Sequence, residues 1–269
     1  MKLAFEKWQG LGNDFVIVSG DDLGESLARR LCDRRRGVGG DGVLCVSEEG
    51  LREEGLKGES ATGARMIVRN ADGSRPEMCG NGLRCVVAWL ATKRGTARGE
   101  LTIATDAGPR RCRFEREGAA SYAVGVDMGL AVVAPFFHEA SAGRDFVHVD
   151  VGNPHVVSFD AFADEELDLV GPALERGVRG GVNVELARQV AERRLVTIVW
   201  ERGVGRTAAC GTGACAVGVA AATRGLVPFD APIEVELPGG VLTITVRGAD
   251  LAVDMLGPAV HAFTGVVEL

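Results

Sequence analysis

Two cysteines each stand directly before a glycine-bracketed turn that leads into an apolar stretch. The first lies in PEMCGNGLRC, residues 76–85, and the second in AACGTGACAV, residues 208–217. A helix N-terminus carries unpaired backbone N–H groups and partial positive charge, so it favours a carboxylate and lowers the pKa of a nearby thiol. Glycine lets those N–H groups approach a ligand closely. We therefore expect Cys79 and Cys210 each to combine an anion hole with a thiol that ionises near neutrality.

If both helix ends face one cleft, such a pair of thiols can invert a stereocentre. A substrate carboxylate would meet two positive helix ends, and the thiols would flank the adjacent carbon on opposite faces. One thiolate would remove the α-proton and the opposite thiol would deliver one, while the N–H donors stabilise the enediolate-like charge. This chemistry requires no cofactor.

The other cysteines are expected to be small buried hydrophobes, which is the usual role of a free cysteine. They are Cys32, Cys45, Cys85, Cys112 and Cys215. The total of seven is odd, which argues against a disulfide framework, and the absence of C-x-x-C argues against zinc and thioredoxin-type chemistry. For Cys79 and Cys210 the alternative is packing at a turn. That alternative is weakened because both precede G-x-G in matching parts of the chain.

The two cysteine motifs belong to a longer internal repeat. GNDFVIV at 12–18 resembles GNPHVVSF at 152–159, RRRGVGGDGV at 34–43 resembles RGVRGGVNV at 176–184, and VDMG at 126–129 resembles VDML at 253–256. The order is the same in both halves, and the offset is 140 for Asn13 and Asn153 and 131 for the cysteines. Matches in a fixed order predict two copies of one domain. We place the copies at residues 1–127 plus 258–269 and at residues 128–257, with the tail returning to the first half.

Each copy is expected to be an α+β domain in which strands surround one buried helix, with the active site in the cleft between the domains. Short runs with the period of a strand recur from LAFEKW at 3–8 to LAVDM at 251–255. SLARRLCDR at 26–34 is an amphipathic helix candidate. RCVVAWLATKR at 84–94 and ACAVGVAAATRG at 214–225 are apolar around most of their circumference, which is typical of central helices.

The composition narrows the class of protein. The 269 residues are 46% hydrophobic and 25% charged, with a net charge of -7 and no basic run longer than residues 34–36, which excludes a nucleic-acid partner. No apolar stretch reaches the ~18 residues of a membrane span, and MKLAFEKWQG has no signal-peptide core. We expect a cytoplasmic protein without a membrane partner, and a homodimer is among the oligomeric states left open.

Over nearly its whole length the chain resembles the diaminopimelate epimerases. The similar motifs are GLGNDFVIV, RNADGSRPEMCGNGLRC, GNPHVV, GVNVE, ERGVGRTAACGTGACA, LPGGVLTI and GPAVHAF. The resemblance implies conversion of L,L-diaminopimelate to the meso form, a step toward lysine and peptidoglycan precursors. It also implies an isomerase that uses neither pyridoxal phosphate nor a metal.

The resemblance assigns roles to individual residues. Cys79 and Cys210 match the two-base pair, in which the first donates and the second accepts a proton for the L,L substrate. Glu201 matches the glutamate that holds the α-ammonium, and His155 matches a histidine that influences activity. The backbones that match those holding the reacting carboxylate belong to Gly80, Asn81, Gly211 and Thr212. Asn13 matches the first substrate-binding asparagine, and the set matching the residues that grip the far end is Asn70, Asn153, Asn183 and Arg202.

Two positions depart from the family pattern. Gly42 stands where many members carry a glutamine that contacts substrate, and Arg206 stands where glutamate is common. Both differences concern substrate affinity and leave the two-thiol chemistry intact. Without the resemblance, Asn70 would be taken for a turn residue, Arg202 for a solvated charge and His155 for a structural histidine.

Three other functions compete with an epimerase of diaminopimelate. A two-cysteine racemase for proline, hydroxyproline or histidine would have no need of the far-end set. A ligand-binding protein with a decayed site would have no need of both cysteines and Glu201. A dinucleotide-binding protein is disfavoured because GLGNDF lacks the third glycine and the strand-turn-helix context of that fingerprint.

Overall fold

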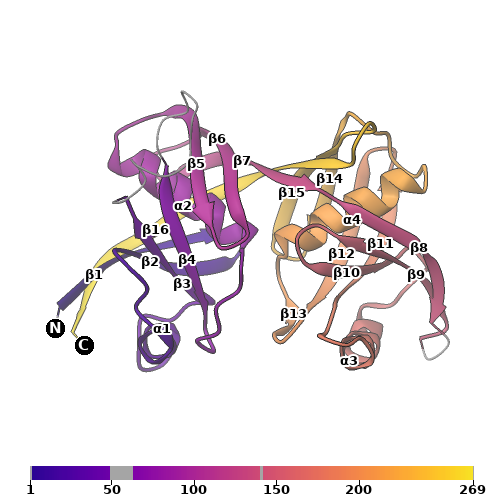
Figure 1. Ribbon diagram of the computed structural model, residues 1–269, viewed down its shortest axis with the longest axis horizontal. Coiled ribbons are helices and arrows are strands. Elements are labelled where there is room, and N and C mark those ends of the chain that lie inside the picture. Colours follow the sequence, from indigo (N-terminus) through magenta and orange to yellow (C-terminus); the bar gives the residue numbers. More distant parts are fainter. Residues whose placement is uncertain (1, 49–62, 140–141, 269) are drawn as a thin grey trace. The chain divides into compact units, whose positions relative to one another are not determined.

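The computed structural model describes residues 2–48, 63–139 and 142–268. It divides into two compact units, Met1–Val126 with Gly257–Leu269, and Asp127–Leu256. Strands dominate both units, and within the described ranges there are four α-helices (Figure 1). The expected strand-rich α+β fold is therefore confirmed.

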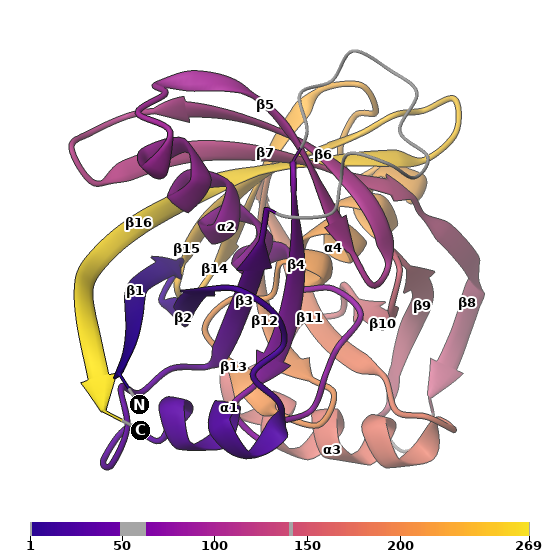
Figure 2. The same ribbon diagram turned by 60° about the vertical axis from the view of Figure 1, so that its left-hand side comes forward.

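The first unit places its strands side by side in the order in which they occur in the chain. The strands are β1 (Lys2–Gly10), β2 (Asn13–Ser19), β3 (Gly42–Ser47), β4 (Ala64–Asn70), β5 (Arg98–Thr105), β6 (Gly108–Arg116) and β7 (Ser121–Leu130). Residues 260–268 of the long strand β16 (Ala252–Glu268) pair antiparallel with β1, from Gln9↔Val260 to Lys2↔Glu268. Figure 2 shows β16 running beside β1 toward the two chain ends.

A tight hairpin joins β1 to β2 and sets the place of Asn13. Leu11 and Gly12 both have positive φ, 56° and 81°, so that Gly10 pairs with Asn13 across a two-residue turn. The GLGNDF stretch is thus a strand–turn–strand, which is not the strand-turn-helix of a dinucleotide site. Asn13 stands at the first position of β2, where the hairpin ends.

The second unit has its own sheet order, β16-β15-β14-β12-β11-β10-β9-β8, with β13 paired to β12. The bounds are β8 (Val132–Glu139), β9 (Arg144–Asp150), β10 (Pro154–Ser158), β11 (Asn183–Ala191), β12 (Arg194–Glu201), β13 (Gly205–Thr207), β14 (Pro232–Leu237) and β15 (Gly240–Val246). β10 and β11 run parallel, and His155 is paired with Asn183. This register places the candidate residues of two separate motifs side by side.

One apolar helix is buried within each unit. α2 (Gly80–Lys93) is buried from Gly80 to Ala91, and α4 (Gly211–Thr223) is buried except at Thr212 and Thr223. Figure 1 shows strands of the same unit around each helix. The expectation of central helices is confirmed, but both helices begin earlier than predicted, because the glycines form the first turn and do not precede it.

The two remaining helices lie on the outside of the units. α1 (Glu25–Cys32) buries Ala28, Leu31 and Cys32 in a cluster with β2 and β3. α3 (Leu167–Gly177), which follows the 3₁₀ turn Asp164–Glu166, buries Leu167, Val170 and Leu174 against β11 and β12. α3 was not predicted, because Pro172 interrupts its helical pattern. Among the described residues, no helix has the length and apolarity needed to cross a membrane.

Candidate active site

Cys79 and Cys210 are the N-caps of the two buried helices. Their backbones are extended and nearly alike, with φ/ψ of -139°/109° and -126°/112°. Each Sγ accepts a backbone N–H from the third residue of its helix, Gly82 at 3.4 Å and Gly213 at 3.3 Å. The thiols therefore occupy the place that a serine or aspartate oxygen usually takes, at the positive end of a helix.

In the first unit the turn that follows Cys79 is tied to the β1–β2 hairpin. Asn81 is 3% exposed, and its Nδ2 donates to Asn13 Oδ1 at 3.4 Å. Asn13 Nδ2 in turn donates to Asp41 Oδ2 at 2.9 Å. Because Asp41 accepts from the amide nitrogen, the Asn13 oxygen faces Asn81. Two of the predicted residues, Asn13 and Asn81, are thus brought together. Asp41, which bonds Asn13, was not predicted from the sequence.

A cluster of charges fixes Asp41 and the start of β2. Arg34 bonds Asp14 at 2.6 Å and Asp41 at 2.8 Å, and the buried Lys7 lies 2.7 Å from Asp14. Burial opposes ionisation of Asp14, but hydrogen bonds from Arg34 and Lys7 outweigh it and hold the pKa of that carboxyl below its usual value. The hairpin end that carries Asn13 is therefore anchored by ion pairs, of which Lys7–Asp14 is largely buried and the two pairs of Arg34 are more exposed.

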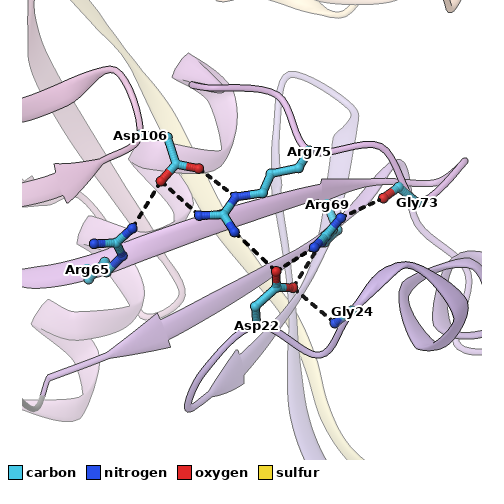
Figure 3. A network of polar contacts seen from close by, with 7 residues as sticks. All are labelled: Asp22, Gly24, Arg65, Arg69, Gly73, Arg75 and Asp106. Atoms are coloured by element: carbon cyan, nitrogen blue, oxygen red, sulfur yellow. Dashed lines mark hydrogen bonds and ion pairs between the residues drawn. The ribbon is translucent and has the colours of Figure 1, made fainter.

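Asn70 is the last residue of β4. The turn that follows it, residues 71–74, leads toward Cys79. Asn70 Nδ2 donates to Ser74 Oγ at 2.9 Å, which is a turn contact within the DGS segment. Figure 3 shows the network behind it: Asp22 accepts from Arg69 at 2.5 Å and Arg75 at 3.3 Å, while Asp106 accepts from Arg75 at 2.6 Å. Both arginines flank the turn, so the network sets where the chain departs toward Cys79.

In the second unit a chain of hydrogen bonds ends at Cys210. Thr212 Oγ1 lies 3.5 Å from Cys210 Sγ and accepts from Asn153 Nδ2 at 3.3 Å. Asn153 Oδ1 lies 3.1 Å from His155 Nε2, and His155 Nδ1 lies 2.7 Å from Glu185 Oε1. Four of the predicted residues are joined in this way. Glu185, at the far end of the chain of bonds, was not predicted.

The protonation of Cys210 differs from the expectation. Burial of the thiol, together with the nearby carboxylates Glu201 and Glu185, raises its pKa well above the usual value, although Thr212 and the Gly213 N–H act in the opposite direction. The prediction of a thiolate near neutrality was therefore wrong for Cys210 in this structure. A helix end supplies only partial charge, and desolvation of a thiol that is 5% exposed exceeds it.

Glu201, Arg202 and Asn183 lie together at the ends of β11 and β12. Asn183 Oδ1 accepts the Arg202 backbone N–H at 3.0 Å, and Asn183 Nδ2 donates to the Pro154 carbonyl at 2.8 Å. Glu201 accepts from Thr207 Oγ1 at 2.5 Å, and burial raises the pKa of its carboxyl. The Arg202 guanidinium is exposed and donates to the Gly180 carbonyl at 3.1 Å.

The two departures from the family pattern have local structural explanations. At Gly42 an added Cβ would lie 2.8 Å from the Arg69 carbonyl, so β3 and β4 approach too closely for a side chain without adjustment. Arg206 pairs with Asp168 of α3 at 3.5 Å and also donates to the Asp164 carbonyl. Its charge is therefore directed toward α3.

The remaining cysteines have the environments expected of small hydrophobes. Cys32, Cys45, Cys85, Cys112 and Cys215 are all buried, and all seven cysteines are free thiols in this structure. Burial raises the pKa of Cys85 to about 12 and of Cys32 to about 11. Within residues 2–48, 63–139 and 142–268, no group of three or more His, Cys, Asp or Glu side chains is arranged to hold a metal ion.

Comparison with known proteins identifies the family of this chain. The family model described as diaminopimelate epimerase matches residues 5–134 and 147–262. The chain belongs to the diaminopimelate epimerase family. The family member from Streptomyces coelicolor is 40% identical over 279 residues, covering 98% of this chain and 95% of that protein. The Synechocystis member is 36% identical over 291 residues and the match covers both chains completely.

Solved structures show that this family shares its fold with other proteins. A phenazine biosynthesis protein of the PhzF family from Bacillus anthracis superposes with a TM-score of 0.74 at 17% identity, covering 100% of both chains. A hydroxyproline epimerase from Agrobacterium vitis has a TM-score of 0.72 at 14% identity, covering 99% of this chain and 91% of that one. At such identities the likeness establishes the fold alone.

Proposed function

We propose that this protein converts L,L-diaminopimelate to meso-diaminopimelate by a two-base reaction, without pyridoxal phosphate or a metal. The observation that carries the proposal is the pair of cysteine N-caps, Cys79 and Cys210, with the same backbone geometry on the two buried helices of a diaminopimelate epimerase chain. In this proposal both helix ends act on one substrate, and the backbone N–H groups of Gly80, Asn81, Gly211 and Thr212 hold its reacting carboxylate.

The proton transfers assign one role to each thiol. With the L,L substrate, the Cys210 thiolate takes the α-proton, and the electron pair of the C–H bond moves into the carboxylate to give an enediolate. Cys79 then delivers its proton to the opposite face of the carbon. The reverse reaction exchanges the two roles. The helix ends stabilise the enediolate charge as it develops.

The raised pKa of Cys210 is compatible with its role as a base, because the substrate brings positive charge to it. Burial and the carboxylates Glu201 and Glu185 oppose the thiolate in the absence of substrate. The α-ammonium group bound at Glu201 would neutralise part of that negative charge and favour the thiolate. Cys210 would therefore ionise when a substrate with an α-ammonium is bound.

The far end of the substrate distinguishes this reaction from that of other two-cysteine racemases. We assign it to Asn70, Asn153, Asn183 and Arg202, because amides meet both an ammonium and a carboxylate while arginine pairs with a carboxylate. Proline and hydroxyproline have no second amino-acid end. Two free thiols are also required, which favours a reducing cytoplasm.

The deciding experiment is incubation of the purified protein with L,L-diaminopimelate in deuterated water, followed by chiral analysis and mass spectrometry. We expect meso product carrying deuterium at the inverted α-carbon, and unchanged activity after dialysis against a chelator. Proline and trans-4-hydroxyproline, tested in parallel, should remain unlabelled. Inversion of proline with no reaction of diaminopimelate would contradict the assigned substrate.

A further inference from the structure

We propose that Glu185 is a positioning residue for Cys210, acting through His155, and that it makes the two thiols unequal. The proposal rests on the two-base reaction proposed above and adds a residue to it. Glu185 lies on β11, is 0% exposed, and its carboxylate contacts His155 Nδ1. The Glu185 charge alone opposes the Cys210 thiolate. The positioning effect runs through the hydrogen bonds of His155, Asn153 and Thr212 and acts in the opposite direction.

The Glu185–His155 pair is buried completely, which is unusual for two ionisable side chains. Both are 0% exposed, and Oε1 and Nδ1 lie 2.7 Å apart. Removing a carboxylate from water is unfavourable unless it is paired and hydrogen-bonded. Glu185 Oε2 has no hydrogen-bond partner among the described residues, so the pairing with His155 satisfies only one of the two oxygens. The 2.7 Å contact with Nδ1 therefore fixes the orientation of the buried His155 ring.

The orientation of His155 decides which way the Asn153 amide points. Nδ1 faces a carboxylate oxygen and Nε2 faces Asn153 Oδ1. Because both oxygens can accept, we assign a donor N–H to each ring nitrogen. Asn153 then has its Nδ2 toward Thr212, and Thr212 accepts that bond. The Thr212 hydroxyl proton is left for Cys210 Sγ at 3.5 Å. This arrangement favours the thiolate, because hydrogen bonds to the charged form of a group stabilise it.

Loss of the Glu185 acceptor would reverse the direction of the hydrogen bonds between His155, Asn153 and Thr212. His155 could then present Nε2 as an acceptor, and the Asn153 amide would turn to donate to it. The Asn153 oxygen would face Thr212 and compete with Cys210 for the hydroxyl proton. The thiolate of Cys210 would lose a donor without any change in the residues that touch the substrate carboxylate.

The second glycine of the CGTG motif accommodates the Glu185 carboxylate. A Cβ at Gly213 would lie 2.7 Å from Glu185 Oε1. In the first unit, the corresponding Cβ at Gly82 would lie 3.0 Å from Leu44 Cδ2. Glycine at residue 213 thus leaves room for an acid beside the first turn of α4, where the helix end favours negative charge.

The register of the two sheets shows that the first unit lacks this pair. Phe15 of β2 pairs with Gly42 of β3, as His155 of β10 pairs with Asn183 of β11. Phe15 and Leu44 therefore take the places of His155 and Glu185, and both are buried apolar residues. Within the part of the chain that the structure describes, only the Cys210 half-site has an acid–imidazole pair behind its asparagine.

Elimination from β-halogenated diaminopimelate isolates the proton abstraction of each thiol. A thiolate takes the α-proton, the C–H electron pair forms the Cα=Cβ bond, and halide leaves with its bonding pair. Only one base is needed. Cys79→Ser and Cys210→Ser identify which stereoisomer each thiol serves, because each variant should retain elimination only from the isomer served by the other thiol. This separation is necessary because turnover in both directions uses both thiols.

The variants of Glu185 then test the proposal. We expect Glu185→Gln to slow elimination from the Cys210 isomer on the order of 10-fold and Glu185→Leu to slow it further, with the Cys79 isomer changed less than about 2-fold. Thr197→Val is the matched control, because Thr197 is 1% exposed on the neighbouring strand and bonds only backbone carbonyls. It should leave both rates unchanged.

Each outcome decides between the positioning role and its alternatives. An equal fall of both rates in Glu185→Gln would overturn the proposal and show a structural role, as would unchanged rates in both Glu185 variants. If Glu185→Leu does not fold, as judged by circular dichroism, Glu185→Gln alone decides, because it preserves size and burial. Absence of elimination by the unmodified protein would instead contradict the proposed two-base function.

Discussion

At the scale of single residues, the two thiols share a position but differ in surroundings. Cys79 is half-buried, whereas Cys210 is buried and lies near two carboxylates. The internal repeat therefore preserves the geometry of the cap but not its electrostatics. A two-base reaction requires one thiol and one thiolate, and unequal surroundings allow the two protonation states to be assigned to particular residues.

Alkylation should reveal the raised pKa of Cys210. Because the thiolate is the nucleophile, we expect the rate at which iodoacetamide labels Cys210 to continue rising above pH 9. The measurement is mass spectrometry of the labelled peptide in a Cys79→Ser background, so that only the Cys210 half-site is followed. A rate that reaches its plateau below pH 8 would show that burial and the two carboxylates do not govern this thiol.

Asp41 should affect substrate binding through Asn13. Asp41→Asn replaces the acceptor of Asn13 Nδ2 and weakens the bond to Arg34, so the Asn13 amide loses its fixed orientation. Loss of a charge-assisted hydrogen bond costs about 1.5–3 kcal/mol, and we expect KM to rise about 10-fold or more. The exposed Asp21, replaced by Asn, is the control. An unchanged KM for Asp41→Asn would remove Asp41 from the site.

Sequence patterns identified the residues with motif chemistry and missed those that support them. CGNG and CGTG carry a visible combination of thiol and glycines, and the asparagines follow from the resemblance. Glu185 stands in NVELA, where a single acid within a strand normally indicates a solvent-facing position. Only the sheet register and the close approach of Gly213 show that its side chain points inward. Comparison of GNDF with GNPH contained a signal for this difference between the half-sites, because histidine takes the position of phenylalanine in the second motif.

At the scale of elements, continuous apolar segments were among those that the patterns failed to resolve. β3 and β10 are buried along nearly their whole length and do not alternate, so period-2 patterns cannot mark them. α3 retains an apolar face despite Pro172, which stands beyond its first turn. The buried helices were found because they are apolar all round, but their starts were set too late, because glycine was taken to precede the helix.

The network around Asp22 should stabilise the first unit in a pH-dependent way. Hydrogen bonds from Arg69 lower the pKa of Asp22 from 3.8 to about 2 against the effect of burial, with further contributions from the Gly24 N–H and Arg75. A carboxyl whose pKa is lowered by folding contributes stability above its unfolded pKa, and that stability is lost as pH falls through the folded pKa. The contribution is therefore complete at pH 7 and absent below about pH 2.

Replacement of Asp22 by Asn tests this contribution. We expect the free energy of unfolding to fall by about 1–2 kcal/mol at pH 7, less than the full shift implies because the side chain is 21% exposed. The deficit should shrink as pH falls toward 2. Urea denaturation at several pH values provides the measurement, and Asp21→Asn is the control. An equal deficit at every pH would mean that the carboxyl acts through packing and not through its charge.

At the scale of the whole molecule, the two units differ in how they are assembled from the chain. The second unit is continuous, whereas the first combines residues 1–126 with the last thirteen. We expect a fragment of residues 127–256 to fold alone, with a cooperative thermal transition. A fragment of residues 1–126 keeps β2 but lacks β16, the second partner of β1, and should aggregate or remain partly unfolded. Adding a synthetic peptide of residues 257–269 should improve its folding. A stable, monomeric 1–126 fragment would show that β16 is dispensable.

The pairing of β1 with β16 also sets an order of events during synthesis. Lys2 leaves the ribosome long before its partner Glu268. Until residues 260–268 have been made, this edge of β1 has no native neighbour, while residues 127–256 can already pair with one another. The half that is made first is therefore completed last. Factors that shield nascent chains would be needed mainly for the N-terminal half.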